Sequence, residues 1–147
     1  HKDMKMVYKR QMQICNSNDY PEEHIKQLTE LFTSEYLIKR AEWTHFYVIC
    51  EDNKIIGCGA IGPYWDKTDE SCFFTIFVLP EYQGKGYGRL IIETLEHDEF
   101  FLKSKRIEIP ASKTGLEFYR HLGYDYKNGN TEPDDEGHYI LEKFRNI

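Results

Sequence analysis

The stretch 78–89 constrains the fold more than any other part of the sequence. It reads Val-Leu-Pro-Glu-Tyr-Gln-Gly-Lys-Gly-Tyr-Gly-Arg and connects an almost uninterrupted apolar run, 72–79, to a segment with the apolar spacing of a helix. A short apolar run of this kind is typical of a strand that is buried on both faces. Pro80 ends the run, because proline cannot continue a central strand. The sequence therefore predicts a strand, a glycine-rich turn and a helix in direct succession.

The glycines of this turn favour an anion-binding site. Gly84, Gly86 and Gly88 lack the side chains that would keep an anion away from the backbone. The helix that follows begins with unpaired N–H groups at the positive end of its dipole. Lys85 and Arg89 stand beside the glycines, and a tight turn without a ligand normally needs only one glycine. The pattern therefore indicates a phosphate or pyrophosphate site.

Two common phosphate-binding motifs do not fit the turn. A P-loop needs GxxxxGK[ST], which the stretch does not contain. A dinucleotide fingerprint needs GxGxxG, and the two registers place Arg89 or Ile91 where the third glycine belongs. An unrelated phosphate-binding or nucleotide-binding domain remains a third-ranked alternative.

The rest of the chain predicts a mixed sheet with helices on its faces. The predicted strands cover 5–15, 45–50, 55–61, 72–79, 106–109, 124–126 and 139–144. The predicted helices cover about 21–40, the segment from the glycine turn to Phe101, and about 113–122. The length of 147 residues favours one domain over 1–147, with the residues before Met4 expected to be a cloning remnant.

Composition excludes several classes of function. The net charge is −6 and the sequence contains no cluster of Lys and Arg, so neither nucleic acid nor an anionic membrane is an expected partner. The four cysteines form no CxxC pair, and the six histidines are scattered, so no metal is expected. No apolar stretch reaches the roughly 18 residues of a membrane-spanning helix. A cytoplasmic protein is the expectation.

The glycine turn resembles a known family signature. Gln83-x-x-Gly86-x-Gly88, together with the preceding Val-x-Pro-Glu-Tyr, is similar to the Gln/Arg-x-x-Gly-x-Gly/Ala signature of the GNAT superfamily of N-acetyltransferases. The resemblance implies an α/β (α+β) fold with a mixed, splayed central sheet of about six to seven strands and helices on both faces. It also implies an enzyme that transfers an acetyl group from acetyl-CoA to an amine by direct transfer in a ternary complex. A non-catalytic acyl-CoA-binding sensor module is the second alternative.

The resemblance also implies where the cofactor binds. Gln83 to Arg89 would hold the pyrophosphate mainly through backbone amides. Backbone groups near Phe77 and Val78 would pair with the pantetheine arm as an added strand does, where a bulge splays the strand from its neighbour. The expected cofactor-binding residues are Phe77, Val78, Gln83, Gly84, Lys85, Gly86, Tyr87, Gly88, Arg89, Ser112 and Phe118.

A second stretch, 112–124, resembles the family pattern N-x-x-A-x-x-F-Y-x-x-x-G-F. Ser112 stands in the place of Asn and Gly115 in the place of Ala, whereas the Phe-Tyr and Gly-Tyr pairs match. By helical spacing alone, Tyr119 is equally well explained as a residue at the edge of the core. The resemblance implies that Tyr119 is the general acid that protonates the departing thiolate.

The general base is less well defined. Some family members have a glutamate at the position that Cys72 occupies here. Glu70 is the candidate base, with Asp69 and His138 as alternatives. Cys72 lies in an apolar run, so core packing explains it better than a nucleophilic role.

The acceptor is expected to be the amine of a small molecule or a peptide. Its pocket is expected from the first helix with the turn that follows it and from the loops Tyr64–Glu70 and Lys127–Gly137. The aromatic and acidic residues named for this pocket are Tyr36, Trp43, Trp65, Asp134, Asp135 and Glu136. Homodimer formation, which is common in similar proteins, is left open.

Overall fold

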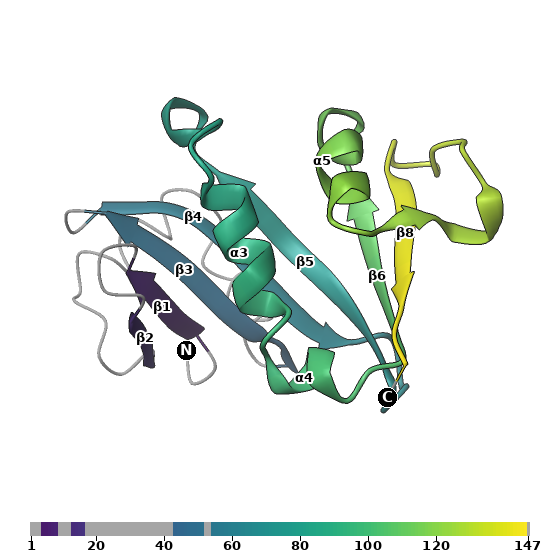
Figure 1. The fold of residues 1–147 in the computed structure, drawn as a ribbon, viewed down its shortest axis with the longest axis horizontal. Helices are drawn as coiled ribbons and strands as arrows, with labels where there is room; N and C mark the ends of the chain where they lie inside the picture. The colour runs from purple at the N-terminus through teal and green to yellow at the C-terminus, as the bar shows by residue number, and fades with distance from the viewer. Residues whose placement is uncertain (1–3, 9–12, 17–42, 52–53, 147) are drawn as a thin grey trace.

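The computed structural model describes residues 4–8, 13–16, 43–51 and 54–146, so the helix predicted for 21–40 lies outside the described residues. Eight strands form one sheet in the order β2-β1-β3-β4-β5-β6-β8-β7 (Figure 1). The strands are β1 (Met4–Tyr8), β2 (Gln13–Asn16), β3 (His45–Glu51), β4 (Lys54–Pro63), β5 (Glu70–Val78), β6 (Arg106–Ala111), β7 (Asp125–Tyr126) and β8 (Tyr139–Phe144).

The mixed α+β architecture is confirmed, with one strand more than the sequence predicts. β1 pairs with β3 and β5 pairs with β6 in parallel, whereas the other neighbours are antiparallel. The additional strand comes from 5–15, which the sequence predicts as one strand. The structure has β1 and β2 there as an antiparallel pair with Lys5 opposite Asn16. An alternating sequence fits one long strand and two short paired strands equally well, because side chains alternate with a period of two in both.

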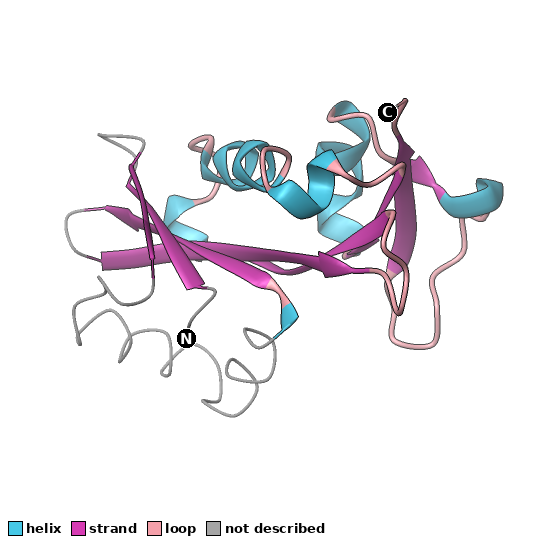
Figure 2. Cartoon of the chain, turned by 90° about the horizontal axis from the view of Figure 1, so that it is seen from below, coloured by secondary structure: helices cyan, strands magenta, loops and turns pink. Residues whose placement is uncertain are grey.

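Three α-helices are described, and they lie on the same face of the sheet (Figure 2). They are α3 (Tyr87–Leu95), α4 (Glu99–Leu102) and α5 (Leu116–His121), together with the 3-10 turns η2 (Pro80–Tyr82), η3 (Lys113–Gly115) and η4 (Lys127–Gly129). The main core lies between these helices and the sheet. α3 packs closely on β4 because Gly59 has no side chain there. A Cβ at Gly59 would come within 2.6 Å of Ile91 Cγ2.

The predicted helix between the glycine turn and Phe101 is divided in two. Asp98 interrupts it with extended backbone angles (φ −72°, ψ 150°), and its carboxylate accepts a hydrogen bond from the N–H of Phe100 at the start of α4. The same carboxylate accepts hydrogen bonds from His45 and Tyr47 of β3. Asp98 therefore connects the helical layer to the sheet, which a regular apolar spacing does not reveal.

The sheet is splayed between β5 and β6. The two strands pair only over Glu70–Cys72 and Arg106–Glu108. Beyond Cys72 they diverge, and Figure 1 shows them meeting at one end and separating toward the glycine turn and α5. β6 continues through Pro110 to Ala111, whereas the sequence predicts its end at Ile109. Proline is tolerated there because β5 has already separated from β6, so only β8 pairs with this part of the strand.

No described helix is both long and apolar enough to cross a membrane.

Candidate active site

A cleft of about 640 Å³ lies where β5 and β6 separate. Its walls come from both strands, from the η3–α5 segment and from the loop before β8. The lining residues are Phe73, Phe74, Thr75, Ile76, Ile109, Pro110, Ser112, Tyr119, Asp134, Glu136 and His138. Among the residues predicted for the site, the cleft brings together Ser112, Tyr119, Asp134, Glu136 and His138.

A β-bulge shapes the β5 side of the cleft. Thr75 and Ile76 together lie opposite the single residue Gly59 of β4, where the register shifts. Thr75 has a positive φ of 55°, which is rare for a β-branched residue. Its carbonyl lies 3.2 Å from Cys58 Sγ, which holds the bulge against β4. The bulge bends β5 at the level of the cleft, directly before Phe77 and Val78.

The glycine turn adopts backbone angles that require glycine at two of its three positions. Gly84 has φ 77° and Gly86 has φ 89°, and Gly86 forms the N-cap of α3. Gln83 holds the turn at the end of β5, because its Nε2 donates to the carbonyl of Val78 at 3.0 Å. Space around Gly84 and Gly86 is open, since a Cβ at either would meet no atom within 4 Å. An anion can therefore approach the start of α3 closely.

Several side chains of the turn are engaged elsewhere. Tyr87 is only 2% exposed and belongs to the core, so its side chain is not available to a ligand. Arg89 Nε lies 3.0 Å from Glu93 Oε1. Lys85 Nζ lies 5.6 Å from the centre of the Tyr82 ring. The geometry thus favours anion binding by the backbone.

Gly88 has a packing role of its own. A Cβ at Gly88 would lie 3.2 Å from Cζ of Phe118. Phe118 is on α5, so this contact brings the two helices together at the open end of the splay. The glycine turn and the segment with Tyr119 therefore face the same opening from opposite sides.

Tyr119 is a buried tyrosine that lines the cleft. Burial raises the pKa of Tyr119 to about 12, so its hydroxyl stays protonated at neutral pH. Within the described part of the chain, no hydrogen bond involves this hydroxyl. Its ring packs closely on Gly115, where a Cβ would approach Tyr119 Cε2 to 3.0 Å. This contact explains why a small residue precedes the helix.

Ser112 both lines the cleft and caps a turn. Its Oγ accepts a hydrogen bond from the N–H of Gly115 at 3.3 Å and lies 3.1 Å from the hydroxyl of Thr114. Ser112 therefore fixes the start of the η3–α5 segment. A serine can provide this cap as readily as the asparagine of the family pattern.

The three candidate bases lie in different surroundings. Glu70 accepts a hydrogen bond from Arg106 Nη1 at 2.9 Å and is not among the residues that line the cleft. Asp69 is partly exposed, and its hydrogen bond from Lys105 lowers the pKa of its carboxyl. His138 lines the cleft, with Nδ1 3.7 Å from Glu136 Oε2. Position alone favours His138 over Glu70.

The sequence did not indicate the role of two further residues. Thr75 forms the bulge. Its only signal in the sequence was that it places a polar residue inside an apolar run. Glu108 lies in a strand beside Cys72 and lines a second cavity together with it. The signal for Glu108 was the alternation of charged and apolar residues over 106–109, since charged residues in a central strand need buried partners.

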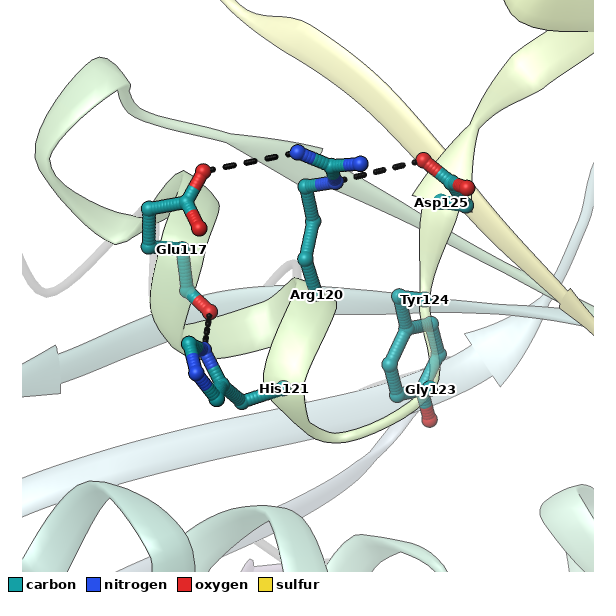
Figure 3. A pocket seen from close by; sticks show the side chains of 6 residues that line it. All are labelled: Glu117, Arg120, His121, Gly123, Tyr124 and Asp125. Carbon is teal, nitrogen blue, oxygen red and sulfur yellow. Dashed lines mark hydrogen bonds and ion pairs between the residues drawn. The ribbon is translucent and has the colours of Figure 1, made fainter.

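A third hollow, of about 390 Å³, lies on the outer side of α5 (Figure 3). Arg120 lies between Glu117 and Asp125, at 3.4 Å and 3.3 Å, and Figure 3 shows His121 turned back to the carbonyl of Glu117. These polar groups satisfy one another at an exposed surface. The hollow shares no residue with the cleft.

No group of three or more His, Cys, Asp or Glu among the described residues is arranged to hold a metal ion.

A model of the acetyltransferase (GNAT) domain matches residues 42–126, which is more than half of the chain. The chain belongs to the GNAT acetyltransferase family. The match contains the bulge, the glycine turn and Tyr119. The chain is therefore an acyltransferase of the GNAT type.

Solved structures of GNAT proteins share the fold at low sequence identity. N-acetylglutamate synthase from Neisseria gonorrhoeae, complexed with coenzyme A and N-acetyl-glutamate, is 20% identical with a TM-score of 0.65 over 90% of this chain but only 34% of that protein. PaiA N-acetyltransferase from Thermoplasma acidophilum, in complex with coenzyme A, is 18% identical with a TM-score of 0.64, covering 88% of this chain and 82% of that one.

A third structure has the acetylated cofactor. It is a GNAT family acetyltransferase from Elizabethkingia anophelis with acetyl-CoA bound, 20% identical with a TM-score of 0.57, covering 77% of this chain and 84% of that one. Among curated proteins, none matches this sequence.

Proposed function

We propose that this GNAT protein is an N-acetyltransferase that moves the acetyl group of acetyl-CoA to a primary amine by direct transfer in a ternary complex. The single observation that carries the proposal is that the splayed strands, the glycine turn and the buried Tyr119 surround one opening. Solved GNAT structures that contain coenzyme A or acetyl-CoA support the choice of co-substrate.

The chain's own backbone provides the proposed cofactor site. The pyrophosphate binds at Gly84–Arg89, where open space meets the positive end of α3. The pantetheine arm lies along β5 at Phe77 and Val78 and adds to the splayed strand edge. Ser112 and Phe118 border the cofactor from the α5 side. The thioester then reaches the bulge, beside Tyr119.

The transfer forms a C–N bond and breaks the C–S bond of the thioester. A neutral amine attacks the thioester carbonyl, and a backbone N–H of β5 stabilises the oxyanion. Tyr119 donates its proton to the departing sulfur. The amine loses one proton as the amide forms, so no proton is gained or lost overall. The hydroxyl of Tyr119 is suited to this step because it stays protonated and is not committed to another group in the described structure.

We assign the proton acceptor to His138 in preference to Glu70. An acceptor amine with a pKa near 10.4 in water must lose a proton before it attacks. An imidazole can accept a proton near neutral pH, and His138 lines the same cleft as Tyr119. Glu70 is already bonded to Arg106 at the closed end of the splay.

The experiment that tests the proposal is calorimetric titration of acetyl-CoA, followed by a thiol-release assay with a panel of primary amines. We expect saturable binding that Gly86→Glu abolishes, because the new carboxylate projects toward the pyrophosphate and strains a position with φ 89°. Gly129→Glu is the matched control, since Gly129 has φ 72° and open space but lies at η4. Binding without thiol release for any amine would indicate a cofactor sensor, and absent binding would disprove the proposal.

A further inference from the structure

A second cavity of about 560 Å³ lies beside the cleft, on the other face of the sheet. Phe73 belongs to the core beneath the helices. Its neighbours Cys72 and Phe74 therefore point to the opposite face, because side chains alternate along a strand. The cavity is lined by Trp43, Pro63, Tyr64, Trp65, Cys72, Phe74 and Glu108.

The cavity has aromatic walls. The ring of Trp43 meets the ring of Phe74 edge-on, with centroids 4.9 Å apart. Trp65 is 83% exposed and has φ 52°, so a large apolar ring stands at the rim on a strained backbone. Such an exposed ring is typical of a ligand-binding site, because its burial by a ligand is favourable. Aromatic faces also attract organic cations.

Glu108, a charged residue of the cavity lining, belongs to a network of charges that extends behind it. Arg106 bonds one carboxylate from each of three strands, with Glu142 at 2.7 Å, Glu70 at 2.9 Å and Glu108 as the third. Lys127 Nζ lies 2.9 Å from Glu108. This hydrogen bond raises the pKa of Lys127, so the lysine is charged at neutral pH.

The network has one negative charge in excess. It combines three carboxylates with two cations, and the three glutamate side chains are only 11–17% exposed. An excess charge with this little solvent around it acts strongly on a ligand nearby. It favours a cationic ligand and opposes one that carries a carboxylate.

The second cavity adjoins the cleft at Phe74, which lines both. A ligand held against Trp43 and Trp65 would extend one end past Phe74 toward Tyr119. On the cleft side it meets Asp134, Glu136 and His138, which again suit a cation. The body of the ligand is thus apolar and its reactive end is an ammonium group that loses its proton in the cleft.

We propose that this cavity is the acceptor pocket and that it selects arylalkyl or similarly apolar primary amines without a carboxylate. The proposal rests on the proposed acetyl transfer for its biological meaning, although the pocket can be tested without the cofactor. The apolar body lies against Trp43, Trp65 and Phe74. Glu108 in this cavity and the carboxylates of Asp134 and Glu136 at the amine end, in the cleft, oppose the carboxylate of the corresponding amino acids.

The test is calorimetric titration of phenethylamine into the cofactor-free protein, with L-phenylalanine as the ligand that differs by one carboxylate. We expect saturable binding of phenethylamine and binding of phenylalanine that is at least about ten-fold weaker. Trp65→Ala should weaken phenethylamine binding about ten-fold. Leu102→Ala, which removes an exposed apolar side chain on α4, is the control and should have no effect.

Glu108→Gln tests the charge separately from the walls. It removes the excess negative charge with little change of shape, so the preference for phenethylamine over phenylalanine should decrease. No saturable binding, equal binding of the two ligands, or binding that is insensitive to Trp65→Ala would overturn the proposal. Thiol release from acetyl-CoA is the separate readout for catalysis: bound phenethylamine without release would disprove acetyl transfer to this amine and leave the pocket intact.

Discussion

Tyr119 has the properties that a proton donor needs at the departing sulfur. Tyr119 lines the cleft, and burial raises its pKa to about 12. The exposed tyrosines of an unfolded chain titrate near 10, so Tyr119 remains a donor over the whole physiological range. Such a group assists only while the C–S bond is breaking, and its contribution is therefore expected in the rate and not in binding.

Tyr119→Phe is expected to lower kcat by about 10²-fold or more, with little change in acetyl-CoA affinity. Steady-state kinetics and calorimetry measure the two effects. Tyr126→Phe removes a hydroxyl from a partly buried tyrosine outside the cleft lining and is the control. A Tyr119→Phe variant with normal kcat would remove the general-acid role.

His138→Gln is expected to lower kcat/KM by about 10²-fold for a primary amine near neutral pH, because it removes the proton acceptor. Glu70→Gln should leave kcat nearly unchanged while it lowers stability, since Arg106 loses one of its carboxylates. Both variants are compared by thiol release and urea unfolding. The reverse result would assign the base to Glu70.

At the scale of elements, the junction of β3 and α4 depends on Asp98. Burial disfavours the charge of Asp98, but hydrogen bonds from His45, Tyr47 and the N–H of Phe100 outweigh it and hold its pKa below the usual value. The ionised form is thus stabilised in the folded state. This contribution is present above the unfolded pKa near 3.9 and is lost as the pH falls through the lower folded pKa.

Asp98→Asn is expected to lower the free energy of unfolding by about 1–3 kcal/mol at pH 7, since it weakens a buried hydrogen-bond network. The difference from the unchanged protein should decrease as the pH falls below about 4, because protonation then removes the same charge. Urea unfolding at several pH values measures it. Asp66→Asn changes an exposed loop residue and should have no effect at any pH.

Local chemistry made several elements predictable from the sequence. Pro80 and the glycines mark the end of β5 and the start of α3, because they act on their own backbone. The division of α3 from α4 was not predictable, since it depends on the contact of Asp98 with β3. The place where β5 leaves β6 depends likewise on pairing between distant segments, and so does the choice among the candidate bases. Trp43 and Trp65 were expected near the acceptor, but the partner Glu108 was not.

At the scale of the whole molecule, the splay divides the described sheet into two parts. β5 and β6 share three residue pairs, and the Gly88–Phe118 contact is a second connection between the parts. A cofactor between the strands would add contacts to both parts at once. Binding and stability are therefore expected to be coupled.

Acetyl-CoA at about 100 times its Kd is expected to add about 2.7 kcal/mol, which raises Tm by about 5–10 °C for a chain of this size. Thermal unfolding followed by circular dichroism measures the shift. Gly129→Glu should retain the shift and Gly86→Glu should lose it. An unchanged Tm in the native protein at saturating cofactor would contradict the coupling.

Arg106 lies at the closed end of the splay, where the two parts of the sheet are joined, and acts as a pivot between them. It joins β5, β6 and β8 through one guanidinium group, so the pivot is stiff while the arms extend beyond it. A small rotation at such a pivot displaces the tips far more than the region beside it. The wide end, where the glycine turn faces α5, is therefore expected to change its spacing more than the paired residues beside Arg106 when the two parts of the sheet move.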